Sequence, residues 1–342
     1  MSTSARGWLE QRLGRASTTP SPREVLIPNR SVMHYLGGIA LFLFLLEVAS
    51  GILLLLPYRP DPDHAHESII AIIGRIPYGG LVRGVHYWAS QLFIGVLLGL
   101  VVGMLVLRRF RAPRELVWLA GLALLLLGIG MAFTGTILPW SQSAYLQALV
   151  SSELLGKTPL IGGWLERILR GGSQVSSWTL HHAYGFHTGV LPAVCTLIIA
   201  IHVWLIRGAA RSAAETEPED GVPIYPDFVV RLAAVCTGVL VVVISLATFA
   251  APELGTAADL RVAAPEHVRP PWYFLFLHQL VRSAPAKLLG VESASFIMGA
   301  LGLVGLGAVI LPFVDRRGSR ITLALSLILI ALCLILSAYA LV

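Results

Sequence analysis

Residues 187–202 read HTGVLPAVCTLIIAIH, an almost wholly apolar stretch that begins and ends with histidine. The flanking residues extend it to an apolar run over about 184–206, which is long enough to cross a bilayer as a helix. A titratable ring inside such a run is costly in lipid and marks a functional site by default. The two histidines, His187 and His202, therefore guide the interpretation of the remaining sequence.

Six further apolar runs accompany this one. Of the 342 residues, 56% are hydrophobic and 13% are charged, whereas an average soluble domain is about a quarter charged. This composition excludes a disordered chain, a disulfide scaffold and an ordinary cytosolic enzyme. It predicts an all-α integral membrane protein with seven transmembrane helices, at about 33–57, 84–107, 116–139, 184–206, 228–250, 291–314 and 320–341.

Positive charge gathers in three of the predicted loops, which share one side of the membrane if the N-terminus also lies there. Basic loops face the cytoplasm, so we expect a multi-pass protein of the cell (inner) membrane with a cytoplasmic N-terminus. These flanking charges account for the formal net charge of +6, so membrane lipid is an expected partner and nucleic acid is not. The arginines concerned are Arg108, Arg109, Arg111 and Arg114, then Arg207 and Arg211, then Arg316, Arg317 and Arg320.

The chain is predicted to divide into two halves. Residues 1–207 would form a four-span half, preceded by a short helix at about 8–13 that lies on the membrane surface. Residues 208–227, rich in Ala, Glu and Pro, would form a cytoplasmic linker to a three-span half over 228–342. The long connection at about 140–183 mixes leucines with polar residues, which predicts further surface helices.

Three histidines within the spans are placed to hold planar cofactors. His187 and His202 lie 15 residues apart, which is a rise of about 22 Å on an α-helix, with the two rings close to one face. His86 lies near the start of 84–107, a span that crosses in the same direction as 184–206. His86 and His187 therefore share one depth, near the outer surface, where two imidazoles can clamp a haem iron axially.

Four glycines lie at matching depths. Gly37 and Gly51 are 14 residues apart in the first span, and Gly121 and Gly135 are 14 apart in the third. Close packing of helices on small residues would explain any single one. However, Gly51 and Gly135 match the outer depth of His86 and His187, while Gly37 and Gly121 match the inner depth of His202. Because glycine permits close approach to the backbone, this coincidence favours two cofactor sites.

Together these residues resemble cytochrome b of the quinol–cytochrome c reductase (cytochrome bc/bf) family. The resemblance covers nearly the whole chain and includes the bf-like spacing of 15 residues between His187 and His202, with the two halves fused in one chain. The segments that carry it are WLEQRL (8–13), YLGG (35–38), LVRGVHYW (81–88), APRELVW (112–118), TGTILPW (134–140), HTGVLPAVCTLIIAIH (187–202) and RPPWYFLFLHQLVRSAPAKLLGV (269–291).

The resemblance implies a four-helix haem-binding bundle and a set of partners. It implies haem b on His86 and His187, with Arg83 pairing a haem propionate, and a second haem at His202. It also implies quinol and quinone as substrates, a Rieske iron–sulfur protein and a c-type cytochrome as partners, and a homodimer. The quinol-site loop would be Pro270, Pro271, Trp272 and Tyr273.

Two features depart from the family. Its loop reads Pro-Glu-Trp-Tyr, and Pro271 replaces the glutamate; proline cannot act as a base, so Glu266, His267 or Asp259 would have to accept the proton. At the inner site the second ligand histidine is replaced by Leu100, and the usual arginine by Gly103. The inner haem is then absent with Leu100 filling its space, five-coordinate on His202, or completed by another group such as His34. Glu47, inside the first span, needs a partner as well.

The sequence therefore predicts a cytochrome b subunit that passes electrons from quinol through haem b to a Rieske protein and a cytochrome c. Two alternatives remain open. One is a single-haem subunit that does not run a quinone cycle. The other is a degenerate structural paralogue that anchors a Rieske protein or a second cytochrome b in a heterodimer. The number of haems per chain, two, one or none, separates the three.

Overall fold

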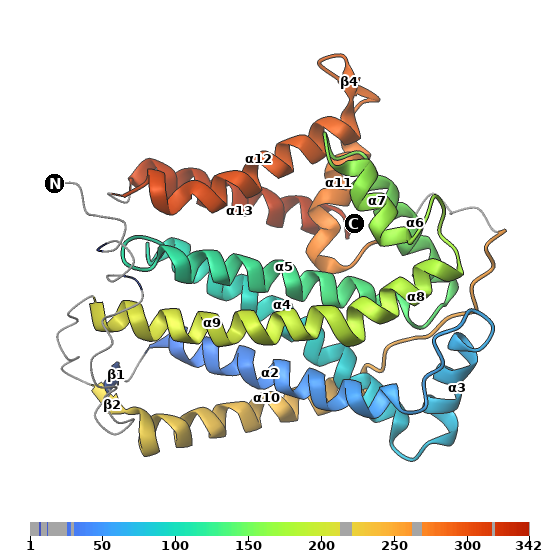
Figure 1. The fold of residues 1–342 in the computed structure, drawn as a ribbon, viewed down its shortest axis with the longest axis horizontal. Coiled ribbons are helices and arrows are strands. Elements are labelled where there is room, and N and C mark those ends of the chain that lie inside the picture. Colours follow the sequence, from blue (N-terminus) through green and yellow to red (C-terminus); the bar gives the residue numbers. More distant parts are fainter. Residues whose placement is uncertain are drawn as a thin grey trace. The chain divides into compact units, whose positions relative to one another are not determined.

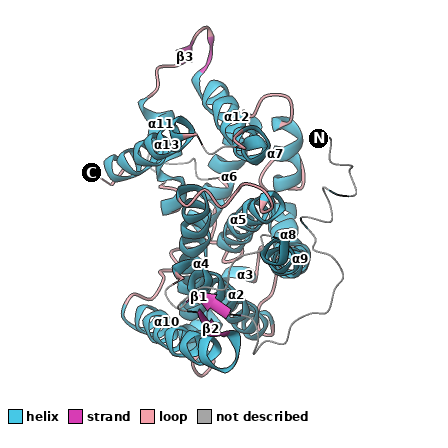
Figure 2. Cartoon of the chain, turned by 90° about the vertical axis from the view of Figure 1, so that its left-hand side faces the viewer, coloured by secondary structure: helices cyan, strands magenta, loops and turns pink. Residues whose placement is uncertain are grey.

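The computed structural model describes residues 7, 12, 26–28, 31–212, 221–261, 269–316 and 319–341. This part of the chain is almost wholly helical, with two short pairs of strands (Figure 2). Seven of its helices are long and apolar enough to cross a membrane (Figure 1), which confirms the predicted all-α membrane fold. They are Val32–Leu55, Gly79–Val106, Glu115–Ile137, Ser177–Ala209, Ile224–Phe249, Ser293–Val314 and Arg320–Tyr339.

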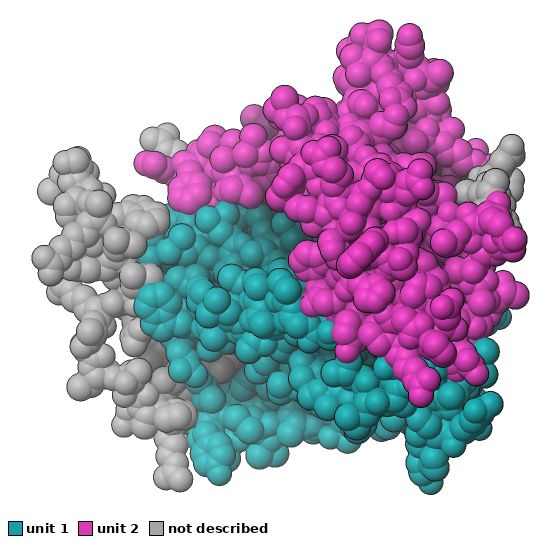
Figure 3. Space-filling model, turned by 45° about the vertical axis from the view of Figure 1, so that its right-hand side comes forward, with its two compact units in different colours: residues 1–58, 68–132, 188–253 teal, residues 59–67, 133–187, 254–342 magenta. Residues whose placement is uncertain are grey.

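The chain forms two compact units, coloured separately in Figure 3. Unit 1 comprises 1–58, 68–132 and 188–253, and unit 2 comprises 59–67, 133–187 and 254–342. The predicted linker at 208–227 is partly helical, because its first residues lie in a helix that runs to Ser212. The predicted surface helix at 8–13 lies outside the described residues except for Arg12, whose guanidinium pairs with buried Glu115. The division into halves at 208–227 stays a prediction.

Unit 1 is built on apolar helices that share one core. Its helices include α2 (Val32–Leu55), α4 (Gly79–Val106), α9 (Leu191–Ser212) and α10 (Val229–Phe249), with most of α3 (Ala65–Arg75) and the first part of α5 (Glu115–Ile137). A short antiparallel pair joins β1 (Leu26–Pro28) to β2 (Gly221–Pro223), and η2 (Ile224–Phe228) precedes α10. The core contains Leu43, Phe44, Phe93, Leu97, Leu124, Cys195 and Val243.

A single π-helical turn, η1 (Phe186–Val190), directly precedes α9. Pro192 explains the position of this turn, because proline has no N–H to donate to the carbonyl four residues earlier and its ring crowds that carbonyl. His187 lies inside the π-turn, so the α-helical geometry assumed from the sequence for 187–202 does not hold at its first residues. Such turns frequently occur at functional sites.

Unit 2 contains the connection at 140–183, which is helical as predicted. Its helices are α6 (Gln142–Gly156), α7 (Gly162–Arg170) and α8 (Ser177–Gly185), followed later by η3 (Trp272–Phe274), α11 (Leu275–Ser283), α12 (Ser293–Val314) and α13 (Arg320–Tyr339). A short hairpin joins β3 (Lys287–Leu288) to β4 (Val291–Glu292). The core of α11 and α12 contains Leu277, Ile297 and Met298.

Candidate haem and quinol sites

The ring of His86, on α4, lies against one face of α2. Its Nδ1 is 3.0 Å from Ser50 Oγ and 3.1 Å from Glu47 Oε2. A Cβ built on Gly51 would lie 3.2 Å from His86 Cε1, tighter than most real contacts, so a larger residue would require the ring to move by a few tenths of an ångström. Glu47, Ser50 and Gly51 stand at i, i+3 and i+4 on α2 and therefore share a face.

The neighbours of His86 determine which of its nitrogens carries the proton. Ser50 Oγ donates its single hydrogen to the carbonyl of Leu46, at 2.7 Å, so toward His86 it can only accept. Glu47 Oε2 lies at the same nitrogen and, as a carboxylate, is a second acceptor. Nδ1 of His86 is therefore the protonated nitrogen, and the lone pair is on Nε2. This is the tautomer that binds a metal through Nε2, with the other ring nitrogen held by surrounding acceptors.

His187, in unit 2, meets the same pair of residue types on α5. Its Nδ1 is 3.3 Å from Thr134 Oγ1. A Cβ on Gly135 would lie only 2.7 Å from His187 Cε1, which is closer than real Cβ contacts permit. Each of the two histidines thus contacts a hydroxyl side chain and the glycine that follows it. The sequence does not by itself single out Ser50 and Thr134, although each stands directly before a predicted site glycine, Gly51 or Gly135.

His202 is less closely confined. A Cβ on Gly121 would lie 3.8 Å from His202 Cε1, an ordinary contact, and 4.0 Å from the sulfur of Met104. Nothing lies within 4 Å of a Cβ built on Gly37, so the structure does not bring this predicted site glycine against a histidine. Nδ1 of His202 is buried without a hydrogen-bond partner among the described residues. The imidazole therefore fits a cofactor ligand, but it has no support from a neighbouring side chain there.

The two substituted positions on α4 are occupied by apolar packing. Leu100 packs against the core of unit 1. A Cβ on Gly103 would lie 2.6 Å from the sulfur of Met33, so Met33 takes the space beside this glycine. His34, the candidate replacement ligand, has its Nδ1 against Ser31 Oγ at the start of α2. Neither Leu100 nor Gly103 therefore offers a ligand atom on α4.

Arg83 joins α4 to the end of α10. Its guanidinium donates to the carbonyls of Pro252, at 2.6 Å, and Glu253, at 3.3 Å. The indole of Trp88, nearby on α4, donates to the carbonyl of Ala250 at 2.8 Å. These side chains thus bind the C-cap carbonyl of α10 and the carbonyls of the segment that follows it. The predicted propionate contact would use the remaining N–H groups of Arg83.

The predicted quinol loop enters α11 through an aromatic cluster. Tyr273 is 8% exposed and Trp272 is 44% exposed. Their ring centroids are 5.5 Å apart in a T-shaped contact, and the ring of Phe274 lies 4.9 Å from that of Tyr273. Pro270 and Pro271 precede this cluster. The loop therefore offers rigid apolar surface in unit 2, the part of a quinone site that suits a ring.

The segment before this loop is tied to the start of α6. The amide of Asp259 donates to Gln142 Oε1 at 2.7 Å, and the amide of Ala258 donates to the carbonyl of Trp140 at 3.1 Å. The carboxylate of Asp259 pairs with Arg261 at 3.0 Å, and hydrogen bonding from Arg261 lowers the pKa of Asp259. A carboxyl with a lowered pKa is a weaker base. The other two candidate bases, Glu266 and His267, lie outside the described residues.

The donor pattern fits haem better than a bare metal ion. Among the described residues, no group of three or more His, Cys, Asp or Glu side chains gathers to hold an ion. A haem iron needs only axial ligands, because the porphyrin supplies the other four nitrogens. The Nε2 lone pair of His86 and the bare glycine backbone beside both rings fit that requirement.

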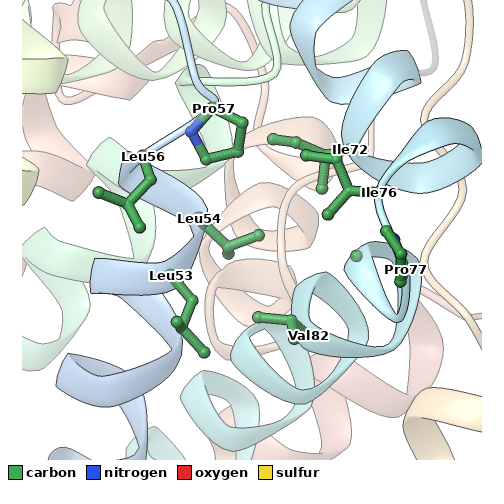
Figure 4. Close-up of a pocket in the computed structure, with 9 residues that line it drawn as sticks. Leu53, Leu54, Leu56, Pro57, Ile72, Ile76, Pro77 and Val82 are labelled. Carbon is green, nitrogen blue, oxygen red and sulfur yellow. The ribbon is translucent and has the colours of Figure 1, made fainter.

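An apolar groove of about 450 Å³ lies elsewhere in unit 1, where the end of α2 meets α3 and the start of α4 (Figure 4). Its lining has no polar side chain to bind a quinol hydroxyl and includes no predicted site residue. The groove is lined by Leu53, Leu54, Leu56, Pro57, Ile72, Ile76, Pro77, Gly79 and Val82.

Two family models match the chain. Cytochrome b/b6/petB matches residues 23–210, and the cytochrome b(C-terminal)/b6/petD model matches residues 258–342. A cytochrome bc complex cytochrome b subunit of Chlorobaculum thiosulfatiphilum is 32% identical over 322 residues, covering 92% of this chain and 74% of that protein. Cytochrome b6 of Heliobacterium mobile is 32% identical over 203 residues, covering 58% of this chain and 95% of that one.

A solved structure of a hyperthermophilic respiratory Complex III has a chain similar in fold. The TM-score is 0.79 at 25% identity, over 93% of this chain and 86% of that one. Both halves of the family are thus present in a single polypeptide whose helices, histidines and glycines suit haem binding. The chain belongs to the cytochrome b/b6 family of multi-pass membrane proteins that bind haem b and serve as subunits of bc-type oxidoreductases.

Proposed function

We propose that this chain carries electrons from quinol in a bc-type complex, through one haem b held axially by His86 and His187. The observation that carries the proposal is the state of the His86 ring. Two acceptors, Ser50 and Glu47, hold its Nδ1–H, so Nε2 presents the lone pair that iron requires. Thr134 and Gly135 give His187 a corresponding environment.

In this proposal the chain binds the haem, orients its ligand imidazoles and shields the quinol from water. When bound, haem b accepts and passes on single electrons. Ser50 and Thr134 orient the two imidazoles, while Gly51 and Gly135 let the rings lie against the helices. Arg83 would pair a propionate with its remaining N–H groups.

Quinol would lie beside Pro270, Pro271, Trp272 and Tyr273, whose rings exclude water. One electron would leave to a Rieske iron–sulfur protein and then to a c-type cytochrome. The quinol protons need a base other than Pro271; Glu266 or His267 is favoured over Asp259, whose carboxylate is already paired with Arg261.

The test is reduction of the haem by quinol. The purified full chain in detergent is oxidised, mixed with a soluble quinol, and followed by the α-band of haem b. We expect His86→Ala to abolish this reduction through loss of haem. The matched control is His64→Ala, which removes an exposed ring paired with Asp61, and it should reduce like the wild type. Equal reduction in both variants would contradict the proposal.

A second candidate function is favoured by the packing around Leu100. Because Leu100 joins the apolar core and Met33 takes the space beside Gly103, the chain would lack the ordinary second haem at His202. Electrons cannot cross the full membrane quickly without that carrier, so such a subunit would not run a quinone cycle. One haem per chain supports this candidate, two support the ordinary cycle, and none supports a structural role in which the chain anchors other subunits.

We also propose an orientation in the membrane and an oligomeric state for the chain. The N-terminus would be cytoplasmic, because the arginine-rich loops after α4, after α9 and between α12 and α13 would then share the cytoplasmic side. The complex would be a homodimer, or a heterodimer with a second cytochrome b, in the cell membrane.

A further inference from the structure

Glu47 is a carboxylic acid inside a membrane-spanning helix. Its side chain is 8% exposed and lies on the same face of α2 as Ser50 and Gly51. An acid at this depth is expensive unless something compensates it, and such residues are functional by default. The site described above needs only one acceptor to fix the proton of His86, and Ser50 already supplies it at 3.0 Å. Glu47 is therefore a second acceptor that requires its own explanation.

The direction of the carboxyl group supplies that explanation. Oε2 of Glu47 is 3.1 Å from His86 Nδ1, while its other oxygen, Oε1, has no hydrogen-bond partner among the described residues. Among the described residues, the polar partner of this side chain is therefore the imidazole of His86. A buried acid that served only to hold the helix together would bond to backbone groups or to a cation, as Glu115 does with Arg12.

A carboxylate hydrogen-bonded to the outer nitrogen of a ligand imidazole changes what that ligand gives to the iron. It draws the Nδ1 proton toward itself, which raises the basicity of Nε2 and fixes the ring orientation. A more basic ligand stabilises the ferric form over the ferrous form, and hydrogen bonding around a haem is one of the means by which a protein sets its potential. Ser50, a neutral acceptor, has much less of this effect.

We infer that Glu47 is a positioning residue that acts through His86 to lower the midpoint potential of its haem. This inference rests on the proposed function, because it requires haem on His86. It assigns the two acceptors different tasks: Ser50 fixes the tautomer, and Glu47 tunes the electron affinity. At the other ligand, His187, the neighbouring side-chain oxygen at Nδ1 is the neutral hydroxyl of Thr134, 3.3 Å away.

The experiment is an equilibrium redox titration of the purified full chain at one fixed pH, with haem content measured on the same samples. Glu47→Gln keeps an acceptor oxygen and the side-chain length but removes the charge, so we expect full haem content and a shift to more positive potential. Glu47→Ala removes the acceptor, and we expect a larger positive shift together with roughly 10–100-fold weaker haem retention. Ser50→Ala and Thr134→Val are the matched controls and should shift the potential less than Glu47→Gln.

The outcomes separate the two claims. If Glu47→Gln and Glu47→Ala hold haem with unchanged potential and unchanged electron paramagnetic resonance, or if the potential falls, Glu47 does not tune the site. If His86→Ala retains the same haem, the proposed function fails instead, whatever the Glu47 variants do. Should Glu47→Ala not fold, the near-isosteric Glu47→Gln decides the question alone.

Discussion

At the scale of single residues, the arrangement around His187 is defined by a hydroxyl side chain and by the missing side chain of a glycine. The position of a Gly135 Cβ, 2.7 Å from the ring, means that no larger residue leaves the imidazole where it is. Gly37, also within a long apolar helix, has open space instead. The four glycines that the sequence groups together therefore differ in how closely a histidine ring approaches them in the folded chain.

We predict that Gly135→Ala lowers the haem content by about one per chain, because the new methyl displaces the His187 ring. The control variant Gly37→Ala should have the same haem content as the wild type. Alanine favours a helix interior by about 0.5–1 kcal/mol over glycine, so a loss in Gly135→Ala would not reflect a weaker helix. Haem and protein are quantified on the same purified samples. Equal haem content in the two variants would count against the assigned role of Gly135.

A second prediction concerns Asp259. Its pKa is lowered by Arg261, so the carboxyl is ionised above that lowered value and does not titrate near neutral pH. Asp259→Asn should therefore leave the pH profile of quinol-driven haem reduction unchanged between about pH 6 and 8. Stopped-flow rates across this range provide the check. A displaced profile in the variant would show that Asp259 is the quinol base.

The sequence predicts which residues carry the proposed chemistry, but it does not predict how they are held. His86, Gly51 and Gly135 follow from spacing alone, because helices repeat and depth is counted along them. The contact of Glu47 with His86 joins residues far apart in the chain, so no local pattern reveals it. Ser50 could have been recognised from its place on the face shared by Glu47 and Gly51. The hydrogen bonds of Arg83 to Pro252 and Glu253 depend on how α4 meets the end of α10.

At the scale of elements, α4 carries one proposed ligand and, further along the same helix, two positions without a ligand atom. His86 lies near its start, whereas Leu100 and Gly103 lie four turns deeper and meet apolar neighbours. The seven apolar helices were predictable because length and hydropathy alone define a span. The π-turn at Phe186–Val190 was not, since it arises from how Pro192 disturbs the preceding carbonyls.

Introducing a histidine at the Leu100 position of α4 tests the hypothesis that the chain binds a single haem. We predict that Leu100→His raises the haem content from one to two per chain, because a second imidazole then stands at the depth of His202. Adding His202→Ala in the same chain should abolish the gain. Redox difference spectra and haem quantification report both. Two haems in the unaltered chain would refute the single-haem reading before any substitution is made.

At the scale of the whole molecule, the distribution of arginines determines which ends of the helices face the cytoplasm. We predict that Ala112→Cys, in the arginine-rich loop after α4, is labelled by a membrane-impermeant thiol reagent only after the cells are opened. Asp63→Cys, between α2 and α3, should be labelled in intact cells. Of the native cysteines, Cys195 and Cys236 are buried and Cys333 is partly exposed, so Cys333→Ser is the background chain for both variants. The reverse pattern would invert the proposed orientation.

The most direct measurement of the central claim is the haem-to-chain ratio of the purified wild type beside His86→Ala and His187→Ala. The account predicts that each substitution removes the same haem, with loss of one low-spin bis-histidine signal in electron paramagnetic resonance. If either variant keeps the full ratio and that signal, the two imidazoles do not share an iron and the account is wrong.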